Sequence, residues 1–211
     1  MKRFVLLILL LCGCATIPQL TREESLKLRN EQIATTTKIY NNVTKEDVLI
    51  ATDKLFRLAD GDDFTITHTE NTVLGNRRWL IYLVLAAAMG QDNWIVAAEE
   101  NPVDKTVKVV VRVSTVSNNL APMMTTGGAN TWSVATLPGV ENTIPGKALY
   151  YIFFKRLDYL LGITDEWLDC ERADAIIKEE KISGSTECLC NSFNIKDSKP
   201  DKMDVVIRKN R

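Results

Sequence analysis

The residues of this chain best suited to chemistry are its cysteines, three of which lie close together in the last quarter: Cys170, Cys188 and Cys190. Structural zinc sites need four ligands, with two to four residues between the members of a pair, so the single residue between Cys188 and Cys190 does not fit. Redox sites favour a Cys-x-x-Cys spacing, which these residues also lack. In an oxidising compartment we expect Cys170 to form a disulfide with either Cys188 or Cys190, which leaves one thiol over.

The first fourteen residues indicate which compartment to expect. Lys2 and Arg3 precede an apolar core, Phe4–Leu11, and Gly13 and Cys14 follow it. A charged start, an apolar core and a small residue before the cut are the parts of a secretory signal peptide. The eight apolar residues would form a helix of only about 12 Å, whereas the hydrocarbon core of a bilayer is ~30 Å thick. We therefore do not expect a retained transmembrane anchor.

The segment Leu11-Cys12-Gly13-Cys14 resembles the lipobox of bacterial lipoproteins, and the resemblance covers only the first fourteen residues or so. Cutting before Cys12 would place bulky Leu11 where a small residue is needed, so cutting before Cys14 is favoured. The resemblance implies a mature chain that begins at Cys14 and carries acyl chains such as palmitate, two or three of which make a durable anchor. Because Ala15 rather than Asp follows, it also implies the periplasmic face of the outer membrane. The alternative is an ordinary secretory signal with an incidental cysteine.

Composition favours one ordinary domain with appendages. Removal of residues 1–13 with Lys2 and Arg3 changes the formal net charge from −1 to −3. Nucleic-acid binding calls for a clustered basic face, so we expect no nucleic-acid partner. We divide the chain into a signal peptide, a lipidated tether with a short helix from Thr21, one domain and a polar C-terminal tail, at 1–13, 14–33, 34–190 and 191–211.

Hydrophobic periodicity predicts a mixture of helices and strands in the domain. Helices are predicted from Thr44 to Leu58, over Lys147–Leu161, and after Thr164, which can cap a helix containing Trp167 and Cys170. Strands are predicted over 34–40, 64–69, 72–77, 93–99 and 106–115. Two residue pairs have the spacing of capping boxes: Thr21 with Glu24, and Thr44 with Asp47.

The run Trp79–Met89 is ambiguous, and we favour a helix over a buried strand because three consecutive alanines favour helix. Most connections between the predicted elements have hairpin length. The fold class that follows is α+β, a two-layer domain in which helices pack on one face of an antiparallel sheet.

Residues 117–146 are expected to form one long loop. They are rich in Asn, Thr, Gly and Pro, show no periodicity, and exceed the length of an ordinary connection. The loop nevertheless holds Met123, Met124 and Trp132, which fold back over the sheet, contact a partner or a membrane, or belong to a disordered segment. Because methionine adapts to irregular surfaces and tryptophan dominates interfaces, we predict that these three residues contact a partner.

Catalytic patterns are weak throughout the sequence. His68, the only histidine, has no nucleophile motif to serve and is expected to be a surface or sheet residue. The acidic stretch Asp60–Asp63 could in principle hold calcium, but an EF-hand needs glutamate where Asn71 stands, so a turn is the better interpretation. We expect no catalytic residues, no metal and no cofactor.

The function expected is therefore that of a non-enzymatic binding or assembly module of the cell envelope, with an envelope protein as partner. The alternative is an envelope-acting enzyme with an unrecognised acidic site. A pocket that brings Asp62, His68 and Arg77 together would favour the enzyme.

Overall fold

The computed structural model describes residues 20–60, 64–83, 86–124, 132–136, 140–142, 146–190 and 199–202. The expected signal peptide and Cys14 lie outside these ranges. Contacts divide the chain into two compact units, Met1–Ile33 and Ala34–Arg211. Within the described ranges, no helix is long and apolar enough to cross a membrane.

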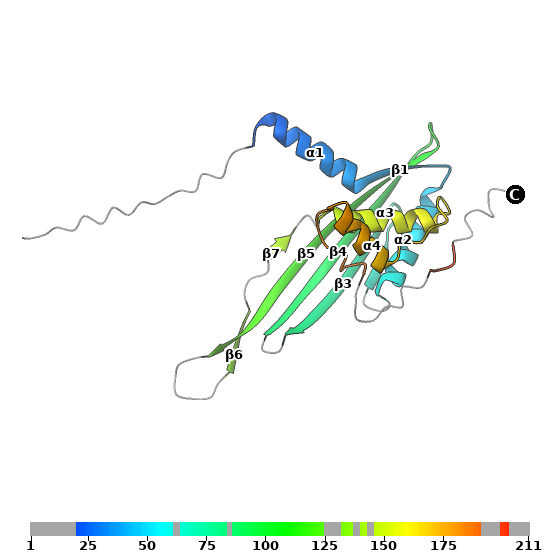
Figure 1. The fold of residues 1–211 in the computed structure, drawn as a ribbon. Coiled ribbons are helices and arrows are strands. Elements are labelled where there is room, and N and C mark those ends of the chain that lie inside the picture. The colour runs from blue at the N-terminus through cyan, green and yellow to red at the C-terminus, as the bar shows by residue number, and fades with distance from the viewer. Residues whose placement is uncertain are drawn as a thin grey trace, which may run out of the picture. The chain divides into compact units, whose positions relative to one another are not determined.

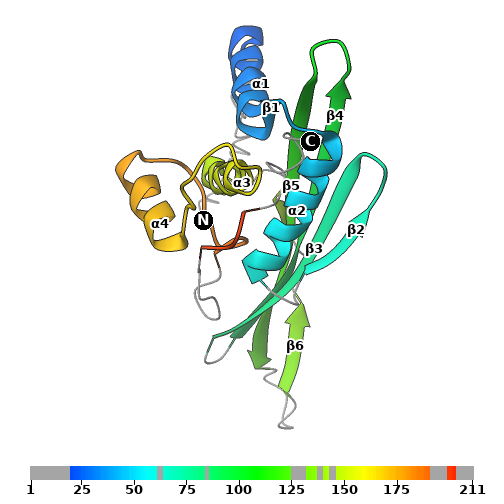
Figure 2. The same ribbon diagram turned by 90° about the vertical axis from the view of Figure 1, so that its right-hand side faces the viewer.

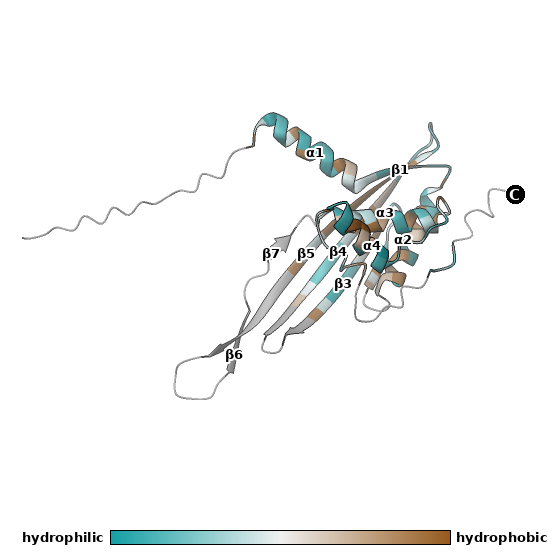
Figure 3. Ribbon diagram, viewed as in Figure 1, coloured by the Kyte–Doolittle hydropathy of each residue, from teal (hydrophilic) through white to brown (hydrophobic). Residues whose placement is uncertain are grey.

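Helix α1 (Arg22–Thr36) begins with a capping box, as predicted. The Thr21 backbone N–H donates to Glu24 Oε2 at 2.8 Å, and the Glu24 N–H donates to Thr21 Oγ1 at 3.2 Å. The helix is mainly hydrophilic (Figure 3), and none of its residues is buried. Because it continues to Thr36, the predicted strand over 34–40 is wrong for its first three residues, and β1 begins only at Thr37.

The second unit is an antiparallel sheet with helices on one face, which confirms the predicted α+β fold. Its main spatial order is β1 (Thr37–Asn41), β5 (Thr106–Met124), β4 (Ala86–Asn101), β3 (Thr72–Leu83) and β2 (Phe64–His68). Two short strands, β6 (Trp132–Thr136) and β7 (Val140–Asn142), also pair with β5. Helices α2 (Lys45–Asp60) and α3 (Lys147–Leu160) lie on the same side of this sheet (Figures 1 and 2).

The core lies between the helices and the inner face of the sheet, where alternate strand residues are apolar. Phe56 of α2 stacks on Phe64 with ring centroids 5.0 Å apart, and Phe153 of α3 stacks on Trp94 at 5.6 Å. Gly75 of β3 lets Phe56 approach, because a Cβ there would lie 2.9 Å from the ring. The other inner-face residues of β4 and β5 are buried beside these rings: Val96, Ala98, Val107, Val109, Val111 and Val113.

Two predictions are wrong at the far end of the sheet. The run Trp79–Met89 is no helix, because β3 pairs with β4 continuously as far as Leu83 opposite Ala86. The expected loop 117–146 contains the end of β5 with β6 and β7. In both places each strand finds its hydrogen-bonding partner on a neighbouring strand, a relationship that local periodicity does not reveal.

One of the two N-terminal caps predicted for the helices of the second unit is present in the structure. At α2 the Asp47 N–H donates to Thr44 Oγ1 at 3.1 Å, which confirms that capping box. The last helix, α4 (Cys170–Glu179), is instead capped by Asp169, whose side chain accepts from the Arg172 N–H. The prediction that Thr164 caps this helix is therefore wrong: its hydroxyl accepts from Glu166 N–H within a turn.

Candidate functional site

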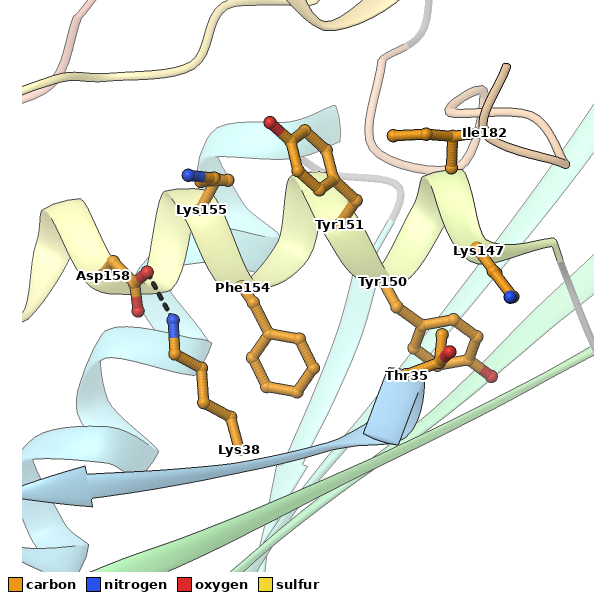
Figure 4. A pocket seen from close by; sticks show the side chains of 9 residues that line it. All are labelled: Thr35, Lys38, Lys147, Tyr150, Tyr151, Phe154, Lys155, Asp158 and Ile182. Carbon is orange, nitrogen blue, oxygen red and sulfur yellow. Dashed lines mark hydrogen bonds and ion pairs between the residues drawn. The ribbon is translucent and has the colours of Figure 1, made fainter. Parts of the chain in front are cut away.

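A pocket of about 370 Å³ lies between α3 and β1 (Figure 4). Its volume falls in the range of pockets that hold small ligands or single peptide side chains. The walls come from one side of α3, from Lys38 on β1 with the preceding Thr35, and from Ile182 beyond α4. The pocket is therefore built within the second unit alone.

The spacing of residues on α3 explains how one helix both fills the core and lines the pocket. Residues three, four and seven apart lie on the same side of a helix. Lys147, Tyr150, Phe154 and Asp158 follow this spacing and line the pocket, while Phe153 lies in the core. Figure 4 shows Tyr150 and Phe154 extending from α3 toward β1.

Asp158 ties α3 to β1 through both carboxylate oxygens. Lys38 Nζ lies 2.5 Å from Asp158 Oδ2, and the Tyr40 hydroxyl donates to Oδ1 at 2.9 Å (Figure 4 shows the Lys38 pair). Burial, and then the negative charge of Asp158, raises the pKa of the Tyr40 phenol, so the phenol remains a donor. The carboxylate is thus engaged by β1, and it acts as a structural tie in the floor of the pocket.

Charges of both signs surround the aromatic wall: lysines line the pocket, while burial, followed by the charges of Glu180 and Glu166, raises the pKa of the Tyr151 phenol. Three lysines line the pocket against the single Asp158, which Lys38 already pairs. Lys155 is exposed, and its Nζ lies 5.6 Å from the centroid of the Tyr151 ring. This combination of aromatic rings with exposed ammonium groups suits a ligand that joins an anionic group to an apolar one.

A second polar cluster is buried on neighbouring strands of the sheet, at Arg77 of β3 and Asp92 of β4. Arg77 Nη1 lies 3.5 Å from Asp92 Oδ2, and the Thr115 hydroxyl donates to Asp92 Oδ1 at 2.7 Å. Burial, followed by the charge of Asp92, raises the pKa of the nearby Cys188 thiol. Cys188 is partly buried, and a thiol that stays neutral is a poor nucleophile, so this cluster is suited to a structural role.

The predicted disulfide is present, and it joins Cys170 to Cys190 with Cα atoms 5.6 Å apart. Cys188 is the leftover free thiol. The disulfide lies beside Arg156, which donates to the carbonyls of Leu168 and Leu189 at 2.9 and 3.1 Å and to Cys170 Sγ at 3.2 Å. Arg156 thereby fixes the two segments that the disulfide joins.

Sequence reasoning missed Arg156, because charged residues adjoin it on α3 and make it resemble part of a solvent-facing surface. The signal that could have identified it is its position: Arg156 lies three residues after Phe153 and four before Leu160, on the apolar stripe of the helix. A charged residue on the apolar stripe of a helix is expected to be buried, and a buried charge needs hydrogen-bond partners.

Two of the residues proposed for an acidic enzyme site, His68 and Arg77, do not come together. His68 Nε2 lies 3.1 Å from Asp53 of α2, whereas Arg77 pairs with Asp92. In the register of β2 with β3, His68 lies opposite Val73, four residues and about 13 Å along the strand from Arg77. Asp62, the third member of that set, lies outside the described residues.

The predicted contact residues lie on paired strands, so the prediction of a loop there is wrong. Met124 of β5 lies opposite Trp132 of β6, and Met123 lies opposite Ser133. The hairpin therefore brings the three predicted contact residues to one end of the sheet. Their role in partner contact stays a prediction, as does lipidation of Cys14.

No protein-family model, curated protein or solved structure matches the chain. In the described part of the chain, no group of three or more His, Cys, Asp or Glu residues could hold a metal ion. The α3–β1 pocket is therefore the candidate site, on its geometry and charge alone.

Proposed function

We propose that this chain is a lipid-anchored, non-enzymatic binding module of the bacterial cell envelope. The anchor is lipid on Cys14 at the periplasmic face of the outer membrane, and its support is the lipobox-like segment Leu11-Cys12-Gly13-Cys14. The partner is an envelope protein, which the module binds through the α3–β1 pocket.

The observation that carries the binding role is the charge and shape of that pocket. Its aromatic wall of Tyr150, Tyr151 and Phe154 supplies apolar contact area, and Lys155 supplies an exposed positive charge. Since Asp158 is already paired with Lys38, a bound carboxylate can meet the exposed Lys155 ammonium. The partner segment therefore carries an acidic residue next to an aromatic or aliphatic one.

The non-enzymatic assignment rests on how the polar groups are used. The carboxylate at the pocket holds β1 against α3, and the buried Arg77–Asp92 pair holds strands together. An acidic enzyme site needs a carboxylate that is open to substrate and a second group within reach of it. His68 contacts Asp53 and Arg77 pairs with Asp92, so these two residues give no support to the alternative of an envelope-acting enzyme.

A photo-crosslinking experiment in intact envelopes tests this proposal. Tyr151 is replaced with the photoreactive residue p-benzoylphenylalanine, which places the reactive group in the pocket wall. We expect one crosslinked envelope protein, whose crosslinked peptide contains an acidic residue beside an apolar one. Lys155→Glu should lower the yield of this product about tenfold, because the new carboxylate repels the acidic residue of the partner segment.

Lys178→Glu is the matched control, because Lys178 is also an exposed lysine but lies on α4, outside the pocket. It should leave the yield unchanged. Equal yields from the two charge reversals, or a crosslinked peptide without an acidic residue, would contradict the pocket as the binding site.

A further inference from the structure

Strand β2 forms one border of the sheet, and within the described ranges β3 is the only strand that pairs with it. Figure 2 shows β2 at this border. The Thr69 N–H donates to the carbonyl of the first residue of β3 at 2.8 Å, so the backbone of Thr69 faces β3. Backbone groups of an antiparallel strand point alternately to its two sides. The N–H and C=O groups of Phe64, Ile66 and His68 therefore point away from β3.

The two ends of the main strand order differ in how they are protected from further pairing. Edge strands are commonly blunted by lysine, by proline or by a charged side chain that points inward. At the other end of the order, β1 has such a residue in Lys38, whose ammonium group pairs with Asp158 of α3. Strand β2 contains no lysine, arginine, carboxylate, proline or glycine. Its central residues, Thr65, Ile66 and Thr67, are β-branched, so β2 is suited to pairing on both sides.

Helix α2 holds both ends of β2 in place. Phe64 is 7 % exposed, and its ring stacks on Phe56 with centroids 5.0 Å apart. At the other end His68 Nε2 lies 3.1 Å from Asp53 Oδ1. The groups that point away from β3 are therefore already arranged for pairing, and a second strand would add to them at little cost in ordering.

We infer that β2 pairs with β2 of a second copy of this chain, so that two sheets join into one across a two-fold axis. The three residues that point away from β3 are symmetric about Ile66. An antiparallel pairing that places Ile66 opposite itself also places Phe64 opposite His68 of the second copy. All three positions then form hydrogen-bonded pairs, and each copy contributes the same surface, as two-fold symmetry requires.

The side chains are complementary in the same register. On the outer face the exposed Thr65 lies opposite Thr67 of the second copy, and threonine pairs across strands are favourable. On the inner face Phe64 and His68 of the second copy form an aromatic pair, and no like charges lie opposite one another. A strand of another protein would have to match this pattern, whereas a second copy matches it by symmetry.

This contact is separate from the α3–β1 pocket, because β1 and β2 lie at opposite ends of the main strand order. A dimer joined through β2 therefore leaves both pockets open and presents two of them to partners. The paired strands have only five residues each, so the contact is short and the dimer should form reversibly with concentration.

Directed disulfide formation tests the pairing and its register on the full chain. Thr65→Cys and Thr67→Cys proteins that carry different tags are mixed at about 100 µM and oxidised, a concentration that detects weak association. In the inferred register these positions form a non-hydrogen-bonded pair with Cα atoms ~4.5 Å apart, which is within disulfide range. Cys170 and Cys190 are already bonded, and the unsubstituted chain measures the background from Cys188.

We expect the mixture to give at least about fivefold more crosslinked dimer than either variant alone, because position 65 lies ~7–8 Å diagonally from position 65 of the second copy. Absence of crosslinked dimer above background in the mixture overturns the inference. Equal yields from the mixture and from the separate variants also overturn it, since the register is then different.

A matched pair of double variants tests the contact without crosslinking. Thr65→Lys with Thr67→Lys places like charges opposite one another, whereas Thr65→Lys with Thr67→Glu places each lysine opposite a glutamate of the second copy. Both positions are exposed, so either variant should fold. Sedimentation of the full chain in mild detergent should show the dissociation constant raised at least about tenfold in the first variant and retained in the second. Equal dissociation constants, or a wild-type chain that stays monomeric, would refute pairing through β2.

Discussion

Arg77 and Asp92 lie directly opposite one another on β3 and β4, and both side chains are buried. Removing two charges from water is expensive, and a hydrophobic pair of similar size often stabilises a protein as well. The pair here has a further contact, because Arg77 also donates to the Glu187 carbonyl at 3.5 Å. It thereby holds the segment that carries Cys188 against the inner face of the sheet.

Replacing one member of the buried Arg77–Asp92 pair should lower the free energy of unfolding more than replacing both. Arg77→Met leaves Asp92 charged and buried, so we expect a loss of about 3–5 kcal/mol in the free energy of unfolding, measured by urea denaturation. Arg77→Met combined with Asp92→Leu should recover most of that loss. Exposed Arg112 on β5 is the control, and Arg112→Met should change stability by less than ~0.5 kcal/mol. A double variant as unstable as the single one would show that the charges themselves are required.

The Cys170–Cys190 disulfide should account for a measurable part of the stability. It closes a loop of 20 residues, for which chain entropy predicts about 3 kcal/mol. Cys190→Ala should lose that amount, and dithiothreitol should destabilise the wild type but not this variant. Peptide mapping without reduction should recover Cys170 joined to Cys190. A bridged peptide containing Cys188 would contradict the pairing.

The partly buried Cys188 thiol predicts that stability falls in alkaline solution. Burial raises its pKa in the folded state, whereas in the unfolded state the thiol ionises near a pH of ~8.5. Above that pH the unfolded chain binds fewer protons than the folded one, so stability declines as pH rises, by at most about 1.4 kcal/mol per pH unit.

Cys188→Ala should flatten this decline between pH 8 and 10 in urea denaturation series. Tyr40, whose pKa burial also raises, contributes equally to both proteins and cancels in the comparison. Identical slopes for the two proteins would mean that the thiol is not buried in solution.

Local patterns predicted the parts of the fold that depend on neighbours in sequence. The capping box of Thr44 with Asp47 spans three residues, and the valines of β5 alternate within a single strand. Helix α3 is predicted because its apolar residues recur at helical spacing. In each case the interacting groups lie within a few residues, so composition and spacing contain the information.

The wrong predictions concern residues whose partners are distant along the chain. The residues of β5 beyond Ser117 pair with β4 residues about thirty positions earlier, and Met124 pairs with Trp132 across a connection. The pocket is a clearer case, because Lys38 and Asp158 lie 120 positions apart and meet only when β1 packs beside α3. Periodicity within one segment contains no information about such pairs.

Trp132 remains the predicted contact residue to change first. In the register of β6 with β5 it lies opposite Met124, so the two predicted contact residues are direct neighbours across the strands. We expect Trp132→Ala to weaken recovery of the crosslinked envelope partner while leaving the melting temperature nearly unchanged. If the indole lies in a core instead, the substitution should cost about 3–5 kcal/mol. A large fall in melting temperature with unaltered recovery would end the contact hypothesis for this residue.

Lipidation of Cys14 is the prediction on which the proposed location depends. Gly13 supplies the small residue before the cut, and the apolar core Phe4–Leu11 is too short to remain as a membrane span. Labelled palmitate should therefore enter the wild-type protein and be lost in Cys14→Ser. Cys12→Ser is the matched control and should keep the label, because Leu11 disfavours a cut before Cys12. Equal incorporation into wild type and Cys14→Ser would leave an ordinary secretory signal as the explanation of these residues, and the chain would then have no lipid anchor at this position.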